Sequence, residues 1–94
     1  MTVLIPTVRN VRDVGKRTND HQVYVGRRTK WGNPYYMSQH GSREEVVELF
    51  RKYFYGSGTL IGAIHELEGK DLICWCAPLP CHADILLEFA NRNN

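Results

Sequence analysis

The residues of this chain best suited to chemistry lie in one short run near its end. Cys74, Cys76, Cys81 and His82 fall within nine residues and include all three cysteines of the 94-residue chain. Thiols and imidazoles bind zinc, act as nucleophiles and carry protons. The run therefore predicts the site of function, and it allows three roles for the cysteines: metal ligands, reactive thiols or core side chains.

Zinc is the first of these alternatives. If a strand continues from Asp71 to Cys76, Cys74 and Cys76 share one of its faces with Cα atoms about 6.5 Å apart, and both thiols can reach one ion. A single intervening residue is nevertheless an atypical spacing for a zinc site. Cys81 and His82 diverge by roughly 100° at a helix start, so a site that uses all four side chains is strained. In this alternative a site with three of these ligands is easier, with the fourth position taken by His21, His40, His65 or water.

A reactive thiol without metal is the second alternative. Cys81 follows Pro80 at the first turn of a predicted helix, where the helix dipole lowers the pKa of a thiol. His82 is then the candidate proton carrier, and Asp84 is the candidate that orients it. Cys81, His82 and Asp84 are thus the predicted catalytic residues, although no recognised catalytic signature matches and the sequence leaves open whether the protein is an enzyme.

The third alternative is structural. Free cysteine is among the most buried residue types, so Cys74 and Cys76 can pack as small apolar side chains of a central strand. Trp75, between them, then points to the opposite face and packs under a helix. One observation argues against a purely structural role. Three thiols and an imidazole gather at the end of a strand, which is where open α/β sheets bind ligands.

A basic loop is the second functional feature. Arg27, Arg28 and Lys30 can pair with phosphates while Trp31 stacks on a base or sugar, a combination typical of nucleotide and single-strand binders. These four residues and Asn33 are the predicted ligand-binding residues. In the structural alternative, Trp31 anchors the core and the following turn merely reverses the chain.

Charge and composition narrow the class of partner. The first 30 residues carry seven basic and two acidic side chains, a net of +5, whereas residues 31–94 carry a net of −3. This asymmetry favours an anionic partner, either a phosphorylated small molecule or nucleic acid. No apolar stretch approaches the roughly 20 residues of a membrane span, and no signal peptide is evident, so we expect a cytoplasmic protein.

The elements that position these residues follow from local patterns. We expect strands over 4–11 and 22–26, with a polar loop between them over 10–21. Ser42 and Glu45 form a capping box ahead of a helix whose apolar face includes Phe50 and Phe54. Thr59 is expected to cap a second helix that Gly69 ends. A strand from Asp71 and a helix over 83–91 complete the order strand, strand, helix, helix, strand, helix.

This order predicts a single small α/β domain over residues 1–94, with a short, mostly parallel sheet flanked by helices and with frayed ends at 1–3 and 92–94. The strand from Asp71 follows a helical crossover, so it should lie parallel to the strand over 22–26. The carboxyl ends of both strands then bring the Cys/His run and the basic loop to one edge of the sheet.

Several of these motifs resemble a known family. The pattern comprises Gly26-Arg27-Arg28, Lys30-Trp31-Gly32-Asn33-Pro34, Ser42-Arg43-Glu44-Glu45, Gly69-Lys70-Asp71-Leu72 and Cys74-Trp75-Cys76-Ala77-Pro78-Leu79-Pro80-Cys81-His82. It is similar to the domain-of-unknown-function family 4326 of bacteria and phages, with Ala83 where a glycine is more usual. The resemblance spans about residues 22–90 and implies a compact single domain that occurs in phage genomes. It implies no activity.

Two functions are therefore expected from the residues. In the first, a small nucleotide-handling domain holds phosphate on the basic loop, and the Cys/His run, with zinc as an optional cofactor, binds or transforms the base or sugar. In the second, a non-catalytic module stabilised by the same cluster binds nucleic acid or a host protein.

Overall fold

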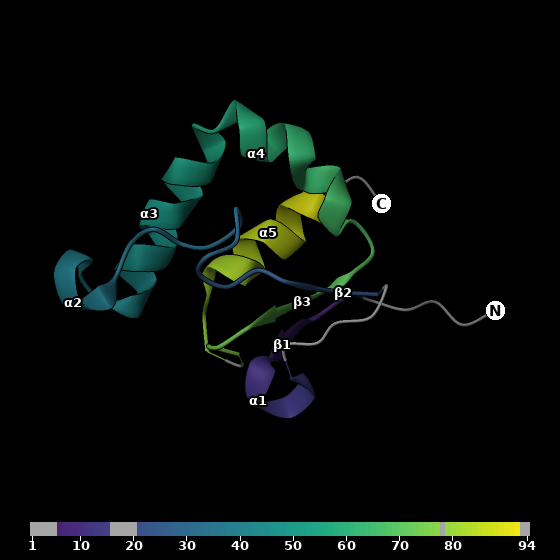
Figure 1. The fold of residues 1–94 in the computed structure, drawn as a ribbon. Coiled ribbons are helices and arrows are strands. Elements are labelled where there is room, and N and C mark those ends of the chain that lie inside the picture. Colours follow the sequence, from purple (N-terminus) through teal and green to yellow (C-terminus); the bar gives the residue numbers. More distant parts are fainter. Residues whose placement is uncertain (1–5, 16–20, 78, 93–94) are drawn as a thin grey trace.

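The computed structural model describes residues 6–15, 21–77 and 79–92 as a three-stranded parallel sheet with helices on both sides (Figure 1). The expected frayed ends at 1–3 and 92–94 lie outside these residues, except for Arg92. In chain order the elements are β1 (Val8–Asn10), α1 (Val11–Val14), β2 (Gln22–Tyr24), α2 (Met37–His40), α3 (Arg43–Tyr55), α4 (Gly58–Ala63), the 3-10 helix η1 (Ile64–Leu67), β3 (Asp71–Cys74) and α5 (His82–Asn91). The predicted α/β class and the order of the six main elements are confirmed.

The sheet is built around β3. Its strand order is β1-β3-β2, and both neighbours pair with β3 in parallel, with Val8 and Val23 opposite Leu72. Leu72 and Ile73 are fully buried although they point to opposite faces, which is the pattern of a parallel strand covered on both sides. The predicted parallel pairing of β2 and β3 is confirmed.

The helix α3 begins as its capping box predicts. The Ser42 hydroxyl accepts a hydrogen bond from the Glu45 backbone N–H, and the Glu45 carboxylate accepts one from the Ser42 N–H. Phe50 and Phe54, one turn apart, are fully buried in the core. This helix therefore forms one wall of the core, on the same side of the sheet as α4 and α5, whereas α1 lies on the other side (Figure 1).

The next helix differs in detail from its prediction. Ser57, rather than Thr59, is the N-cap, because its hydroxyl accepts a hydrogen bond from the Leu60 N–H at 3.3 Å. The helix α4 ends at Ala63, and the chain continues as the tighter helix η1 to Leu67. Gly69 adopts a positive φ of 74° after that helix, as expected of a residue that ends it.

The predicted length of the N-terminal strand is wrong. The observed strand β1 covers only three residues of the expected strand over 4–11, whose residues 4 and 5 lie outside the described part of the chain. The expected polar loop starts instead with α1, because the Asn10 side chain caps it by accepting from the Arg12 N–H and Val11 becomes buried. The one-turn helix α2 was also not expected from the sequence.

The end of β3 also departs from expectation. The strand stops at Cys74, so Cys76 lies in the following turn rather than on the same strand face as Cys74. Trp75 does not pack under a helix: half of its surface is exposed, and its indole Nε1–H donates to the Tyr24 hydroxyl at 3.0 Å. The turn is held by Asn10, whose side-chain amide donates to the carbonyl oxygens of Trp75 and Ala77. Two hydrogen bonds from Asn10, at the end of the neighbouring strand β1, thus hold the turn at which β3 ends.

Candidate functional site

The basic loop and the Cys/His run meet in one pocket at the carboxyl ends of β2 and β3. Its volume is about 120 Å³. The polar and reactive side chains that line it are those of Arg27, Asn33, Arg43, Cys74, Trp75, Cys76, Cys81 and His82, and its apolar lining comes from Met37, Val46, Val47 and Pro80. The predicted convergence of the two motifs is confirmed, whereas Arg28, Lys30, Trp31 and Asp84 lie outside this lining.

The three cysteines are free thiols in three different settings. Cys74 ends β3 and is buried, Cys81 is the buried N-cap of α5, and Cys76 is half-buried in the turn between them. The Cys81 sulfur accepts a hydrogen bond from the Ala83 N–H at 3.4 Å, as a capping side chain does. Two of the thiols therefore lie at the ends of regular elements, where the backbone holds their positions.

Cys74 and Cys81 interact, and their pKa values move in opposite directions. Hydrogen bonds from the Cys81 thiol and from the N–H groups of Cys76 and Ala77 lower the pKa of Cys74 to about 6, against the opposing effect of burial. The same contact raises the pKa of Cys81, because the loss of its proton would remove the donor, and burial adds to this effect. The pKa of Cys81 is thus raised, contrary to the prediction that the helix terminus lowers it, and Cys74 is the more acidic thiol of the pair.

The His82 imidazole is held in one tautomer. Its Nε2 lies 2.6 Å from the Val25 carbonyl oxygen, which can only accept, so Nε2 carries the proton. Burial lowers the pKa of His82, against the effect of this hydrogen bond, so the ring is neutral and Nδ1 has a free lone pair. The Cys81 sulfur lies 3.4 Å from that Nδ1. His82 is thus placed to accept a proton from Cys81.

Asp84 has a different position from the one expected. Its carboxylate accepts a hydrogen bond from the Cys81 backbone N–H at 2.9 Å and completes the capping box of α5. The group that orients His82 is instead the Val25 carbonyl. A backbone carbonyl on another strand carries no side-chain signal in the sequence, so sequence reasoning could not have found it.

Within the basic loop, only Arg27 and Asn33 line the pocket. The Arg27 guanidinium donates to the carbonyl oxygens of Asn33 and Tyr35, and it stacks 3.8 Å above the Tyr36 ring. The buried Asn33 side chain donates to the Val46 carbonyl and accepts from the Tyr35 N–H. Both residues therefore shape the loop, and Arg27 keeps part of its five-donor guanidinium for a ligand.

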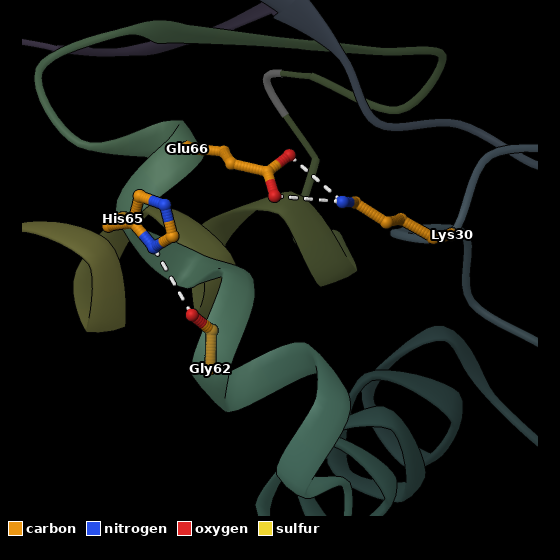
Figure 2. Close-up of polar contacts among 4 residues, drawn as sticks. All are labelled: Lys30, Gly62, His65 and Glu66. Atoms are coloured by element: carbon orange, nitrogen blue, oxygen red, sulfur yellow. Dashed lines mark hydrogen bonds and ion pairs between the residues drawn. The ribbon is translucent and has the colours of Figure 1, made fainter.

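The other predicted loop residues have structural or peripheral positions. Trp31 is only 3% exposed and anchors the core, as in its structural alternative. The Lys30 ammonium lies 2.9 Å from both carboxylate oxygens of Glu66 on η1, beside His65, which contacts the Gly62 carbonyl (Figure 2). Arg28 is exposed and adopts a positive φ of 74°.

Two pocket residues were missed from the sequence. Arg43, in the first turn of α3, lines the pocket, and its guanidinium lies 3.5 Å from the Pro80 carbonyl oxygen. Trp75, which the structural alternative placed under a helix, presents a half-exposed indole at the pocket. Both residues belong to the resemblance pattern given above, and this was the one available signal.

Zinc binding stays a prediction, and the arrangement of the described residues does not favour it. In the part of the chain that the structure describes, no group of three or more His, Cys, Asp or Glu side chains is placed to hold a metal ion. Cys76 leaves the strand face of Cys74, and the imidazole Nε2 of His82 is committed to the Val25 carbonyl. The same described residues include no helix long and apolar enough to cross a bilayer.

Fold and site together define a small parallel α/β domain with a pocket of thiols and arginines at the carboxyl edge of its sheet. The chain belongs to the family described as domain of unknown function DUF4326, whose profile matches residues 8–92. It is 42% identical over 88 residues to the uncharacterized 12.4 kDa protein in the nrdA-td intergenic region of Enterobacteria phage T4, with 89% of this chain and 81% of the phage protein covered.

A second relative comes from a giant virus. The chain is 31% identical over 104 residues to uncharacterized protein R718 of Acanthamoeba polyphaga mimivirus, with 92% of this chain and 77% of that protein covered. No solved structure matches. The comparisons thus establish the family and its presence in viruses that infect bacteria and amoebae.

Proposed function

We propose that the pocket binds a phosphorylated, nucleotide-like ligand. The observation that carries this proposal is the set of charged groups at the pocket: its described lining residues include two arginines, Arg27 and Arg43, and no carboxylate. Guanidinium groups recognise phosphate through paired, charge-assisted hydrogen bonds. An anionic group is therefore the complement of this lining.

Trp75 supports the nucleotide-like part of the proposal. Its indole is half exposed, lines the same pocket and is oriented by its hydrogen bond to the Tyr24 hydroxyl. A base stacked on an aromatic ring gains about 1–3 kcal/mol, and a ring that is already held in place loses little entropy on binding. Trp75 thus replaces Trp31 as the stacking residue.

The size of the pocket limits how the ligand binds. A volume of about 120 Å³ is small beside the roughly 300–1,000 Å³ of pockets that enclose whole drug-sized ligands. We therefore place a phosphate or sugar in the pocket and the base outside it, on the exposed indole. The proposal is one of binding and includes no reaction on the ligand.

The test is calorimetric titration of the reduced protein with inorganic phosphate, ribose 5-phosphate, adenosine and AMP. AMP is expected to bind more tightly than either phosphate or adenosine. Arg43→Ala should weaken AMP binding by about 10- to 100-fold, the usual effect of losing a hydrogen bond to a charged group. Arg51→Ala is the matched control, because Arg51 lies on the same helix, pairs with Glu48 and does not line the pocket. If no mononucleotide binds at millimolar concentration, the proposal fails.

Nucleic acid is the second candidate, favoured by the net charge of +5 in the first 30 residues. The same titrations with single-stranded DNA and RNA oligomers distinguish the two. Oligomer affinity that exceeds AMP affinity and falls steeply with salt concentration would favour a nucleic-acid-binding module. Comparable affinity for AMP and oligomers, with a weak salt dependence, would favour the mononucleotide.

A further inference from the structure

Two of the three thiols meet at one end of the pocket, although they come from different elements. Cys74 ends β3, Cys81 caps α5, and both side chains line the pocket. We propose that Cys74 and Cys81 form a redox-active pair that reduces a small hydroperoxide, with Cys74 as the attacking thiol and Cys81 as the resolving thiol. This activity goes beyond the proposed binding of nucleotides and does not depend on it.

Cys74 is assigned the attack because its surroundings stabilise a thiolate, which is the nucleophilic form of cysteine. The N–H groups of Cys76 and Ala77, in the turn after β3, lower the pKa of Cys74. The Asn10 side chain fixes that turn through hydrogen bonds to two of its carbonyl oxygens, 3.1 and 2.8 Å long. The donors are therefore in place before any oxidant arrives.

Cys81 is assigned the second step because it has a base beside it. The His82 Nδ1 lies 3.4 Å from the Cys81 sulfur and carries a lone pair, since Nε2 is protonated and donates to the Val25 carbonyl. His82 is also packed edge-on against the Phe50 ring, at 5.2 Å between ring centres. The imidazole is thus held in an orientation that can receive the Cys81 proton.

The burial of the pair limits the substrate to small molecules. Cys74 is 1% exposed and Cys81 is 2% exposed, and both side chains line the pocket of about 120 Å³. Hydrogen peroxide fits such a pocket, whereas a peptide disulfide does not. Cys76 is half-buried in the turn, so it is the competing thiol with easier access and provides an internal comparison.

The proposed reaction balances in two steps. The Cys74 thiolate attacks one peroxide oxygen, the O–O bond breaks, and the product is a Cys74 sulfenic acid and hydroxide, which takes up a proton to become water. The Cys81 thiol then passes its proton to His82 Nδ1, and its sulfur attacks the Cys74 sulfur. The S–S bond forms, and the hydroxide that leaves Cys74 takes the proton from His82 as a second water. Two thiols are oxidised and one peroxide is reduced.

The experiment exposes the fully reduced, nucleotide-free chain to stoichiometric hydrogen peroxide near neutral pH and maps the products by mass spectrometry. Lys70 and Arg92 leave all three cysteines in one tryptic peptide, so an added chymotryptic cut after Trp75 is needed to separate Cys74 from the other two. The expected product is a Cys74–Cys81 disulfide, formed at least about tenfold faster than oxidation of Cys76 because Cys74 is the better thiolate. A disulfide that includes Cys76 would overturn the proposal, as would a chain that stays reduced.

Three variants assign the roles. Cys76→Ser is the matched control and should oxidise like the wild type. Cys81→Ser should stop at a sulfenic acid on Cys74 that dimedone traps, and Cys74→Ser should lose the fast reaction. If either buried variant fails to fold, the disulfide map of the wild type and of Cys76→Ser still decides the outcome. Failure to bind AMP would leave these results unchanged, so the two proposals fail separately.

Discussion

The His82 imidazole donates its Nε2 proton to the Val25 carbonyl oxygen at 2.6 Å and so ties the first turn of α5 to the residue after β2. Val25 itself stays in register with the sheet, because its N–H donates to the Ile73 carbonyl at 3.0 Å. This hydrogen bond therefore joins the edge of the sheet to the start of α5, next to the Cys81 thiol. It also makes stability depend on pH.

The first prediction concerns this pH dependence. The pKa of His82 is lowered by burial from its usual 6.5, so below pH 6.5 the unfolded chain takes up a proton that the folded chain refuses. The contribution of neutral His82 to stability is therefore complete above pH 6.5 and is lost as the pH falls toward its folded pKa. Urea unfolding between about pH 7.5 and about pH 5.5 should show this loss.

The matched variants for this experiment are His82→Gln and His65→Gln. Glutamine at residue 82 can still donate to the Val25 carbonyl but takes up no proton, so the acid loss of stability should flatten. His65 is exposed on η1, and its replacement should leave the loss as it is in the wild type. If the free energy of unfolding falls equally with decreasing pH in all three proteins, His82 is not the group responsible for the pH dependence.

The second prediction concerns Trp75 as the stacking residue. Trp75→Ala should weaken AMP binding by about 5- to 150-fold, which corresponds to the 1–3 kcal/mol of base stacking. Trp75→Phe should retain most of the affinity because it keeps an aromatic face, although it loses the hydrogen bond to Tyr24. Calorimetric titration measures both. Tyr55→Ala, which removes an exposed aromatic ring away from the pocket, should have no effect.

The third prediction concerns two glycines at which a substitution by alanine should have opposite effects on stability. A Cβ on Gly32 would lie 2.9 Å from both the Gly26 carbonyl oxygen and the Arg27 Cα, so Gly32→Ala should destabilise the fold by about 1–3 kcal/mol. A Cβ on Gly62, inside α4, would meet nothing within 4 Å, so Gly62→Ala should stabilise by about 0.5–1 kcal/mol through helix propensity. The urea midpoint should fall for Gly32→Ala and rise for Gly62→Ala. An unchanged midpoint for Gly32→Ala would contradict the close contact between Gly32 and the backbone of Gly26 and Arg27.

The fourth prediction separates Lys30 from the pocket. Lys30 and Glu66 form an exposed ion pair, and exposed pairs contribute little to stability. Lys30→Ala should therefore leave the urea midpoint and the affinity for AMP unchanged, in contrast to Arg43→Ala. A loss of AMP affinity in Lys30→Ala would show that the ammonium leaves Glu66 to reach the ligand, contrary to the arrangement in Figure 2.

Local signals predicted the parts of the fold that depend on neighbouring residues. The Ser42 capping box and the spacing of Phe50 and Phe54 place α3 correctly because a cap and an apolar face are set within a few residues. One error arose where a distant group intervenes: Asn10 ends β3 early by binding the carbonyl oxygens of the turn. The other error is local, because Ser57, two residues before Thr59, is the cap of α4.

The candidate site likewise divides into features that the sequence predicts and features that depend on the tertiary structure. Residue types and spacing alone identified the Cys/His run and the basic loop, and the chain order of strands and helices predicted that they meet at one edge of the sheet. The individual roles required the tertiary structure. Trp31 is buried, as in its structural alternative, whereas Trp75 lines the pocket, and Arg43 reaches the pocket from α3.

By itself, then, the sequence determined the α/β order of elements, the family and the two motifs that form the pocket. The tertiary structure decided which thiol is the thiolate, which tautomer His82 adopts and which tryptophan faces solvent. The physical reason is that pKa values, tautomers and burial depend on hydrogen-bond partners and on desolvation. Some of those partners, such as the Val25 carbonyl for His82, lie dozens of residues away along the chain. Others, such as Cys81 for Cys74, are close in sequence but are brought together by the turn after β3.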